Sequence, residues 1–159
     1  MNSGELTLCL KCADLEASSR FYVALGLEVL ERTAGRVVLK SGHGRIALMS
    51  FLEENCLNFR GGDAFALHAA GVAAELGLAG EPERYPAAKY GATADGACWS
   101  TYDPDGNNVF FDTNDAETSE AGRAERRRQL LEDTASVLRS LGASADCVAT
   151  LLTLAEAER

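Results

Sequence analysis

Residues 103–108 (DPDGNN) mark a tight turn, and the runs on both sides of them read as strands. Proline presets φ in such a turn, the aspartates can bond to nearby backbone, and glycine accepts positive φ. The run 97–102 (ACWSTY) precedes the turn, and the run 109–112 (VFFD) follows it. This pattern predicts a β-hairpin.

A second signature lies near the start of the chain. Residues 5–12 (ELTLCLKC) read as a strand, Asp14 suits the N-cap of a following helix, and Gly26 suits its C-terminal stop. The expected apolar stripe of this helix consists of Leu15, Ser18, Phe21, Tyr22 and Leu25. Three strands joined by glycine-containing turns should then form a meander, at about 27–33, 36–41 and 44–51.

The segment after the meander predicts a repeat of the same order of elements. Residues 52–62 are polar and end in paired glycines, which indicates a linker. The second unit is expected as a strand at 63–69, a helix at 71–79, and strands at about 84–90, 96–102 and 107–113. The predicted fold class is therefore α+β, with two βαβββ units whose curled sheets pair around a cleft.

Residues 117–159 lose the strand signals and become rich in Ala, Glu, Arg and Leu. Apolar residues recur there at helical spacing on both sides of Gly142, which predicts an αα-hairpin. We therefore expect a domain at 1–116 and a helical extension at 117–159. The extension is interpreted as a packing or dimer-clamping element, with a lid over the cleft as the alternative.

The two signatures together, 14–30 (DLEASSRFYVALGLEVL) and 103–111 (DPDGNNVFF), resemble the vicinal oxygen chelate superfamily. That superfamily holds glyoxalase I, extradiol dioxygenases, fosfomycin-modifying enzymes and bleomycin-resistance proteins. The resemblance covers roughly residues 5–113. It implies the βαβββ pair, and for the enzymes it implies one divalent metal held by His, Glu or Gln side chains in the cleft.

The resemblance also places the four metal-ligand positions in this sequence. They fall on Thr7, Ala47, Ala64 and Phe110, none of which is a metal ligand of that kind. A metal-free protein that binds a small organic molecule, similar to the bleomycin-resistance branch, is the function this implies, with no cofactor and no catalytic residue. The alternative is a metal-dependent glyoxalase-like or dioxygenase-like enzyme (a lyase, isomerase or oxygenase) with an atypical site.

Strand alternation and the resemblance nominate a set of side chains for the cleft. The candidates are Thr7, Cys9, Lys11, Arg45, Ala47, Met49, Ala66, His68, Trp99, Thr101, Asn108, Phe110 and Asp112. Cys9, His68 and Asp112 are the donors that a displaced metal site would use. Trp99 could stack on a ligand or lie in the core, and His43 is expected in an exposed turn.

The charge and composition of the chain limit the classes of partner that we expect it to bind. The chain has 159 residues and a formal net charge of −9, which disfavours nucleic acid. No apolar run approaches the roughly 20 residues that span a bilayer, so no membrane partner is expected. Five scattered cysteines fit reduced thiols in the cytoplasm. Sheet edges and the apolar stripe of the helical extension predict a homodimer.

Overall fold

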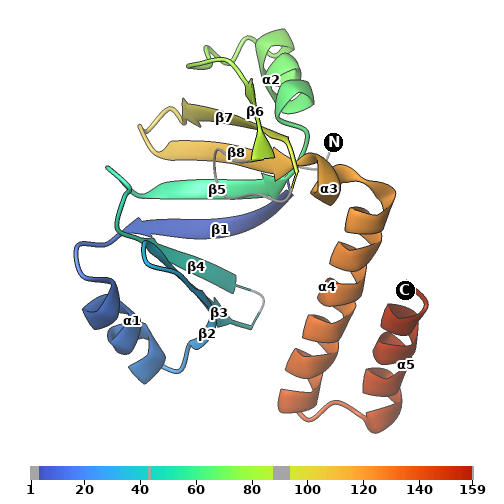
Figure 1. Ribbon diagram of the computed structural model, residues 1–159. Coiled ribbons are helices and arrows are strands. Elements are labelled where there is room, and N and C mark those ends of the chain that lie inside the picture. The colour runs from blue at the N-terminus through green and yellow to red at the C-terminus, as the bar shows by residue number, and fades with distance from the viewer. Residues whose placement is uncertain (1–3, 43, 88–93, 159) are drawn as a thin grey trace. The chain divides into compact units, whose positions relative to one another are not determined.

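The computed structural model describes residues 4–42, 44–87 and 94–158 (Figure 1). They form two compact units, one ending at Asp115 and the other beginning at Ala116. His43 and the last residues of the strand expected at 84–90 lie outside the described residues.

The compact unit that ends at Asp115 contains two βαβββ units. The first βαβββ unit consists of β1 (Gly4–Lys11), α1 (Leu15–Ala24), β2 (Glu28–Arg32), β3 (Arg36–Ser41) and β4 (Gly44–Met49). The Asp14 carboxylate caps α1 by accepting a hydrogen bond from the Ala17 amide at 2.9 Å. Gly26 has a φ of 94°, which favours glycine and ends the helix.

The buried face of α1 differs from the predicted apolar stripe. Leu15 and Tyr22 pack against the core, and Ser19 between them is buried. Phe21 and Leu25, by contrast, are 60% and 64% exposed. The buried face follows the helical spacing from 15 through 19 to 22. The small Ser19 is therefore buried, whereas the hydrophobic residues Phe21 and Leu25, which were expected to be buried, are exposed.

The second βαβββ unit has the predicted order of elements, but the boundaries of its strands and helix differ from those predicted. Its elements are β5 (Cys56–Gly61), α2 (Ala64–Ala73), β6 (Glu83–Tyr85), β7 (Gly96–Tyr102) and β8 (Asn108–Asn114). The prediction of a strand at 63–69 and a helix at 71–79 is wrong, because the helix begins at Ala64. Asp63 caps it by accepting a hydrogen bond from the Ala66 amide at 3.0 Å.

The strand of this unit lies in the segment that was predicted to be a linker. β5 pairs antiparallel with β1 and parallel with β8, so it has a hydrogen-bonded neighbour on both sides. Leu57 and Phe59 alternate with Asn58 and Arg60, as in a half-buried strand, but this short pattern is hidden within a polar segment. Pairing in the middle of the sheet satisfies the backbone of this segment. The strand β5 therefore depends on its pairing with β1 and β8 in the folded structure.

The eight strands found in the described part of the chain form one open, curved sheet (Figure 1). The strand order is β2-β3-β4-β1-β5-β8-β7-β6, which places β1 and β5 side by side at the centre. Each central strand also pairs in parallel with the last strand of its own unit, β1 with β4 and β5 with β8.

Both helices pack on the same face of this sheet. Val37, Leu39 and Leu48 form the core beneath α1, and Ala97 and Trp99 form the core beneath α2. Cross-strand partners share a face, and the register carries this face across the sheet. The pairs that do so are Leu10–Leu48, Leu8–Leu57, Leu57–Val109 and Trp99–Phe111.

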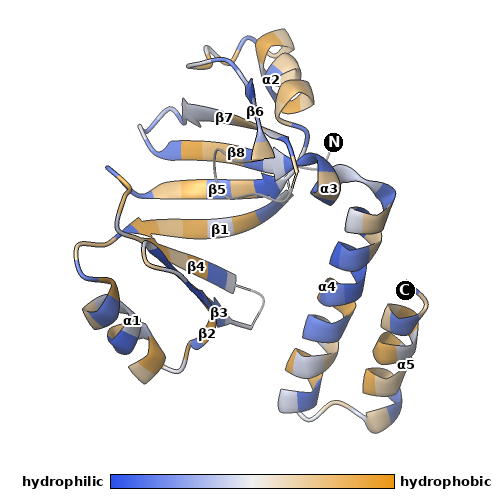
Figure 2. Cartoon of the chain, viewed as in Figure 1, coloured by the Kyte–Doolittle hydropathy of each residue, from blue (hydrophilic) through white to orange (hydrophobic). Residues whose placement is uncertain are grey.

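The helical unit that begins at Ala116 contains the predicted αα-hairpin, formed by α4 (Glu120–Ser140) and α5 (Ala145–Glu156). The short helix α3 (Asp115–Thr118) precedes it in the chain. Hydrophilic residues predominate along α4 and hydrophobic ones along α5 (Figure 2). Arg127 joins the two helices through hydrogen bonds of 3.0 and 2.8 Å to the Glu158 carboxylate. Within the described part of the chain, no helix is both long and apolar enough to cross a membrane.

Candidate functional site

The candidate site lies on the sheet face opposite α1 and α2, which we call the open face. Cys9 lies beside Ala47 on β4 and beside Cys56 on β5. Asn58, two residues along β5, lies beside Phe110 on β8. Because successive side chains alternate between faces, these residues share the open face at the centre of the sheet.

Most of the predicted site residues lie on this face. They are Thr7, Cys9, Lys11, Arg45, Ala47, Met49, Asn108, Phe110 and Asp112. Cys9 and Ala47 are buried, with exposures of 1% and 2%. Lys11 is exposed, and its ammonium donates to the Glu53 carbonyl at 3.0 Å. The centre of the open face is thus partly shielded from water and its margin is polar.

The other predicted residues lie elsewhere. Ala66 and His68 belong to α2, because the segment is a helix rather than a strand. Trp99 is 4% exposed in the core under α2, where it stacks on Phe111 and donates to the Ala79 carbonyl at 3.0 Å. Thr101 shares that face and accepts a hydrogen bond from the Ala79 amide at 3.1 Å.

The possible donor set Cys9, His68 and Asp112 is not brought together. The His68 ring lies edge-on to Trp99 with a centroid distance of 5.0 Å, on the helix-covered side of the sheet. Cys9 and Asp112 lie on the open face. A displaced metal site of these three residues is therefore wrong on geometric grounds.

Sequence reasoning missed the residues that β5 contributes to the open face. They are Cys56, Asn58 and Arg60. A signal for β5 is present in the sequence, because Asp14 and Asp63 both cap a helix that is followed by Leu-Gly-Leu, at 25–27 and 76–78. Cys56 precedes Asp63 by seven residues, as Thr7 precedes Asp14, so Cys56 and not Ala64 occupies the repeat-equivalent position.

The corrected set of four positions is Thr7, Ala47, Cys56 and Phe110. It offers one thiol and no imidazole or carboxylate, whereas a catalytic divalent ion needs about three protein ligands. Among residues 4–42, 44–87 and 94–158, no group of three or more His, Cys, Asp or Glu side chains could hold a metal ion. The residues present therefore do not fit the divalent ion of the superfamily's enzymes.

Cys9 and Cys56 form a thiol pair at the centre of the open face. Both are free cysteines, and Cys56 is half-buried. A hydrogen bond to Cys56, together with burial, raises the pKa of Cys9 well above its ordinary value, while the same hydrogen bond lowers the pKa of Cys56. Asn58 and Arg36 lie close enough to Cys9 to oppose this rise in its pKa.

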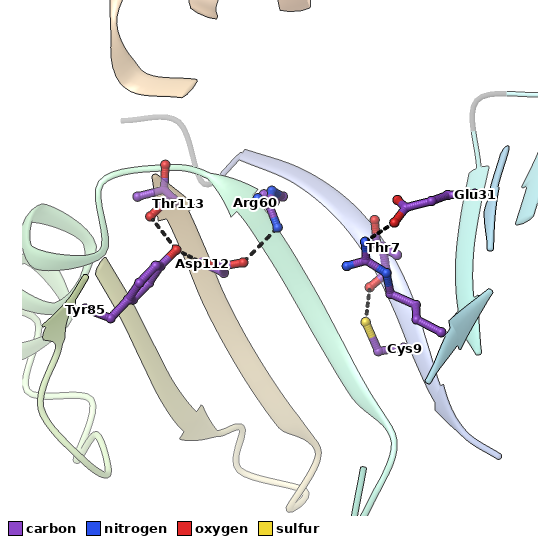
Figure 3. A network of polar contacts seen from close by, with 8 residues as sticks. Thr7, Cys9, Glu31, Arg60, Tyr85, Asp112 and Thr113 are labelled. Carbon is purple, nitrogen blue, oxygen red and sulfur yellow. Dashed lines mark hydrogen bonds and ion pairs between the residues drawn. The ribbon is translucent and has the colours of Figure 1, made fainter. Parts of the chain in front are cut away.

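A polar network extends the site over β8 toward β6 (Figure 3). Asp112 accepts hydrogen bonds from Arg60 at 2.9 Å and from the Tyr85 hydroxyl at 2.7 Å. The Tyr85 hydroxyl also lies 3.0 Å from the Thr113 carbonyl, and desolvation followed by the Asp112 contact raises the pKa of Tyr85. This network holds the Asp112 carboxylate between the Arg60 guanidinium and the Tyr85 hydroxyl.

Within residues 4–42, 44–87 and 94–158, two buried polar atoms of the open face have no hydrogen-bond partner. They are Arg36 Nε, a donor, and Asn58 Oδ1, an acceptor. The Arg36 guanidinium still pairs with Glu31 through its Nη2 atom. Buried polar atoms without partners are rare in native proteins and often mark a place that water or a ligand fills.

A carboxylate closes one margin of the open face. Glu54 Oε1 accepts hydrogen bonds from the Asn108 amide and from the Tyr102 hydroxyl, each at 2.7 Å. These two donors, Asn108 first, lower the pKa of Glu54. The contacts tie the loop between β4 and β5 to the strands β7 and β8.

Comparisons with known proteins identify the fold. No family model matches the chain, and a search of curated proteins finds no match. A glyoxalase/bleomycin resistance protein/dioxygenase superfamily member from Vibrio splendidus 12B01 is 20% identical in sequence. The match has a TM-score of 0.53 and covers 69% of this chain and 97% of that one.

A second solved structure, described as an NAD-dependent benzaldehyde dehydrogenase from Legionella pneumophila, is 14% identical. The match has a TM-score of 0.55 and covers 69% of this chain and 98% of that one. At these identities the likeness concerns the fold. Together with the two βαβββ units, it shows that the chain has the fold of the glyoxalase/bleomycin resistance/dioxygenase, or vicinal oxygen chelate, superfamily.

Proposed function

We propose that the open face binds a small organic molecule without the help of a catalytic divalent metal. The observation that carries this proposal is the set of side chains at the four positions where enzymes of the superfamily hold their ion. Thr7, Ala47, Cys56 and Phe110 replace hard donors with a hydroxyl, a methyl group, a thiol and an aromatic ring.

The chemistry of the face supports an organic ligand. Phe110 provides apolar surface, and Arg36 Nε and Asn58 Oδ1 provide one buried donor and one buried acceptor without partners among the described residues. Apolar area with a few placed polar groups is the usual composition of a small-molecule site. A matching ligand would carry a flat apolar part, one hydrogen-bond donor and one acceptor.

Charge on this face is nearly balanced by ion pairs. Arg60 pairs with Asp112 at 2.9 Å, and Arg45 pairs with Glu5 at 3.3 Å. The face therefore favours a neutral or zwitterionic ligand over the strongly cationic one that a net charge of −9 would attract.

A thermal-shift screen of the full-length protein against small organic molecules tests this proposal. A ligand at about 100 times its dissociation constant adds about 2.7 kcal/mol of stability. Phe110→Ala should remove most of the shift, because it deletes the apolar surface of the site. Phe59→Ala is the matched control, because it deletes the same ring from the neighbouring strand on the opposite face.

The metal-dependent alternative is tested in parallel. Glyoxalase and ring-cleavage activities are measured with added Ni, Zn, Mn and Fe(II), before and after treatment with a chelator. We expect no turnover under any of these conditions. Activity that disappears with chelator and returns with metal would establish the enzyme instead.

We also propose that the protein is a homodimer in the cytoplasm, where its five cysteines would stay reduced. α1 packs on β3 and β4, and α2 packs on β7 and β8, so within the described residues of the unit that ends at Asp115 the two helices make their main contacts away from the central strands β1 and β5. Leu6 and Leu8 on β1 are 50% and 36% exposed there. A second copy of the chain would bury this apolar strip.

A further inference from the structure

Cys9 and Cys56 lie directly opposite each other on the two central, antiparallel strands. They come from different βαβββ units, and both thiols are free. Cys9 is 1% exposed, whereas Cys56 is half-buried and can be reached from the open face. The pair therefore combines the buried thiol of Cys9 with the more accessible thiol of Cys56.

The backbone shows which kind of cross-strand pair this is. The Cys12 amide donates to the Met49 carbonyl on β4 at 3.0 Å, and the Lys11 amide donates to the Asn55 side chain, just before β5, at 2.9 Å. Amide directions alternate along a strand, so the amide of Cys9, like that of Lys11, points toward β5. Cys9 and Cys56 thus form a hydrogen-bonded pair.

This geometry places the Cβ atoms farther apart than a relaxed disulfide prefers. Hydrogen-bonded antiparallel pairs have Cα atoms about 5.5 Å apart, against about 4.5 Å in the alternate pairs, and their Cβ atoms lie near 5.5 Å. A disulfide needs Cβ atoms about 3.5–4.5 Å apart. β4 and β8 hold β1 and β5 from outside, so the central strands cannot easily approach each other.

We propose that Cys9 and Cys56 bind a soft monovalent cation of the Cu(I) class as a two-coordinate bis-thiolate. Thiolates select soft ions, and an ion inserted between two facing sulfur atoms does not require the close Cβ approach of a disulfide. Zn²⁺ would require about four donors. The described ranges offer no cluster of three His, Cys, Asp or Glu that could supply them.

Binding of Cu(I) to the two thiols balances in protons and in charge. Each thiol releases one proton to solvent and forms one sulfur–metal bond, and the oxidation state of the ion does not change. The product carries one net negative charge. The Arg36 guanidinium lies within electrostatic reach of Cys9 and offsets part of that charge, although it also pairs with Glu31.

The proposed Cu(I) site shares Cys56 and Arg36 with the open face proposed for the organic ligand, but it needs only the two sulfur donors of Cys9 and Cys56. The test uses the reduced, full-length protein under anaerobic conditions, in a Cys147→Ser background that removes the exposed thiol of α5. Cu(I) is supplied as its bicinchoninate complex. We expect the protein to withdraw one Cu(I) per chain and to develop a sulfur-to-copper charge-transfer band.

Cys9→Ala and Cys56→Ala should each abolish the band and the one-to-one stoichiometry. Cys98→Ala is the matched control, because Cys98 is also buried on the open face but lies opposite Asp112 and Glu83 rather than a cysteine. Circular dichroism checks that the variants fold. Should Cys56→Ala misfold, alkylation of Cys56 in the folded protein replaces it and should also prevent Cu(I) uptake.

Two results would overturn the proposal. One is equal Cu(I) uptake by Cys56→Ala and Cys98→Ala. The other is rapid formation of an intramolecular Cys9–Cys56 disulfide with diamide, because it would show that the sulfur atoms are close enough to bond. The organic-ligand thermal shift is measured on the same variants, so that loss of one activity is distinguishable from loss of the other.

Discussion

Glu54 illustrates how a single surface residue connects pH to the candidate site. Its carboxylate accepts from Asn108 and Tyr102, and these contacts lower the pKa of Glu54 in the folded state. A carboxyl group with a lowered folded pKa stabilises the fold above its unfolded pKa of about 4.3, and this contribution is lost as the pH falls through the folded value.

We therefore predict that Glu54→Gln flattens the acid limb of the stability curve. Glutamine keeps an acceptor oxygen for Asn108 and Tyr102 but cannot titrate. Urea denaturation measured from about pH 6 down to about pH 3 should show a smaller loss of stability in this variant than in the wild type. Glu53→Gln, one residue earlier, should follow the wild-type curve, and a flattened curve there as well would contradict the assignment.

At the scale of elements, the N-cap of α2 decides where the second unit places its strand and its helix. Asp63 holds the Ala66 amide at 3.0 Å, so that β5 ends before it and α2 begins after it. We predict that Asp63→Ala lowers the free energy of unfolding by about 1 kcal/mol. Asp63→Asn keeps a capping oxygen and should cost much less. Equal urea midpoints for the two variants would show that the cap contributes little.

At the scale of the whole molecule, the exposed leucines Leu6 and Leu8 of β1 predict association. Sedimentation at micromolar concentration should give twice the 16.9 kDa mass of one chain. Leu6→Ser should shift the equilibrium toward the monomer, because it places a hydroxyl group in the proposed interface. Leu130→Ser, which changes a similarly exposed leucine of the helical unit, is the control. A wild-type monomer would rule out the dimer.

The sequence by itself determined the elements that carry their own local signals. Asp14 and Gly26 delimit α1, the 103–108 turn joins β7 to β8, and the spacing of apolar residues reveals α4 and α5. Caps, turns and helical periodicity depend on residues a few positions apart, so a linear reading detects them. Together with the resemblance carried by residues 14–30 and 103–111, these signals predicted the fold class, although not the strand and helix boundaries of the second βαβββ unit.

Only the tertiary structure decided the rest. β5 exists as a strand because β1 and β8 pair with it from both sides, and Trp99 faces the core because α2 covers that side of β7. Cys9 and Cys56 meet through the antiparallel register of the central strands. Cross-strand register joins residues distant in sequence, and shifting it by one residue reverses every face, so no local pattern encodes it.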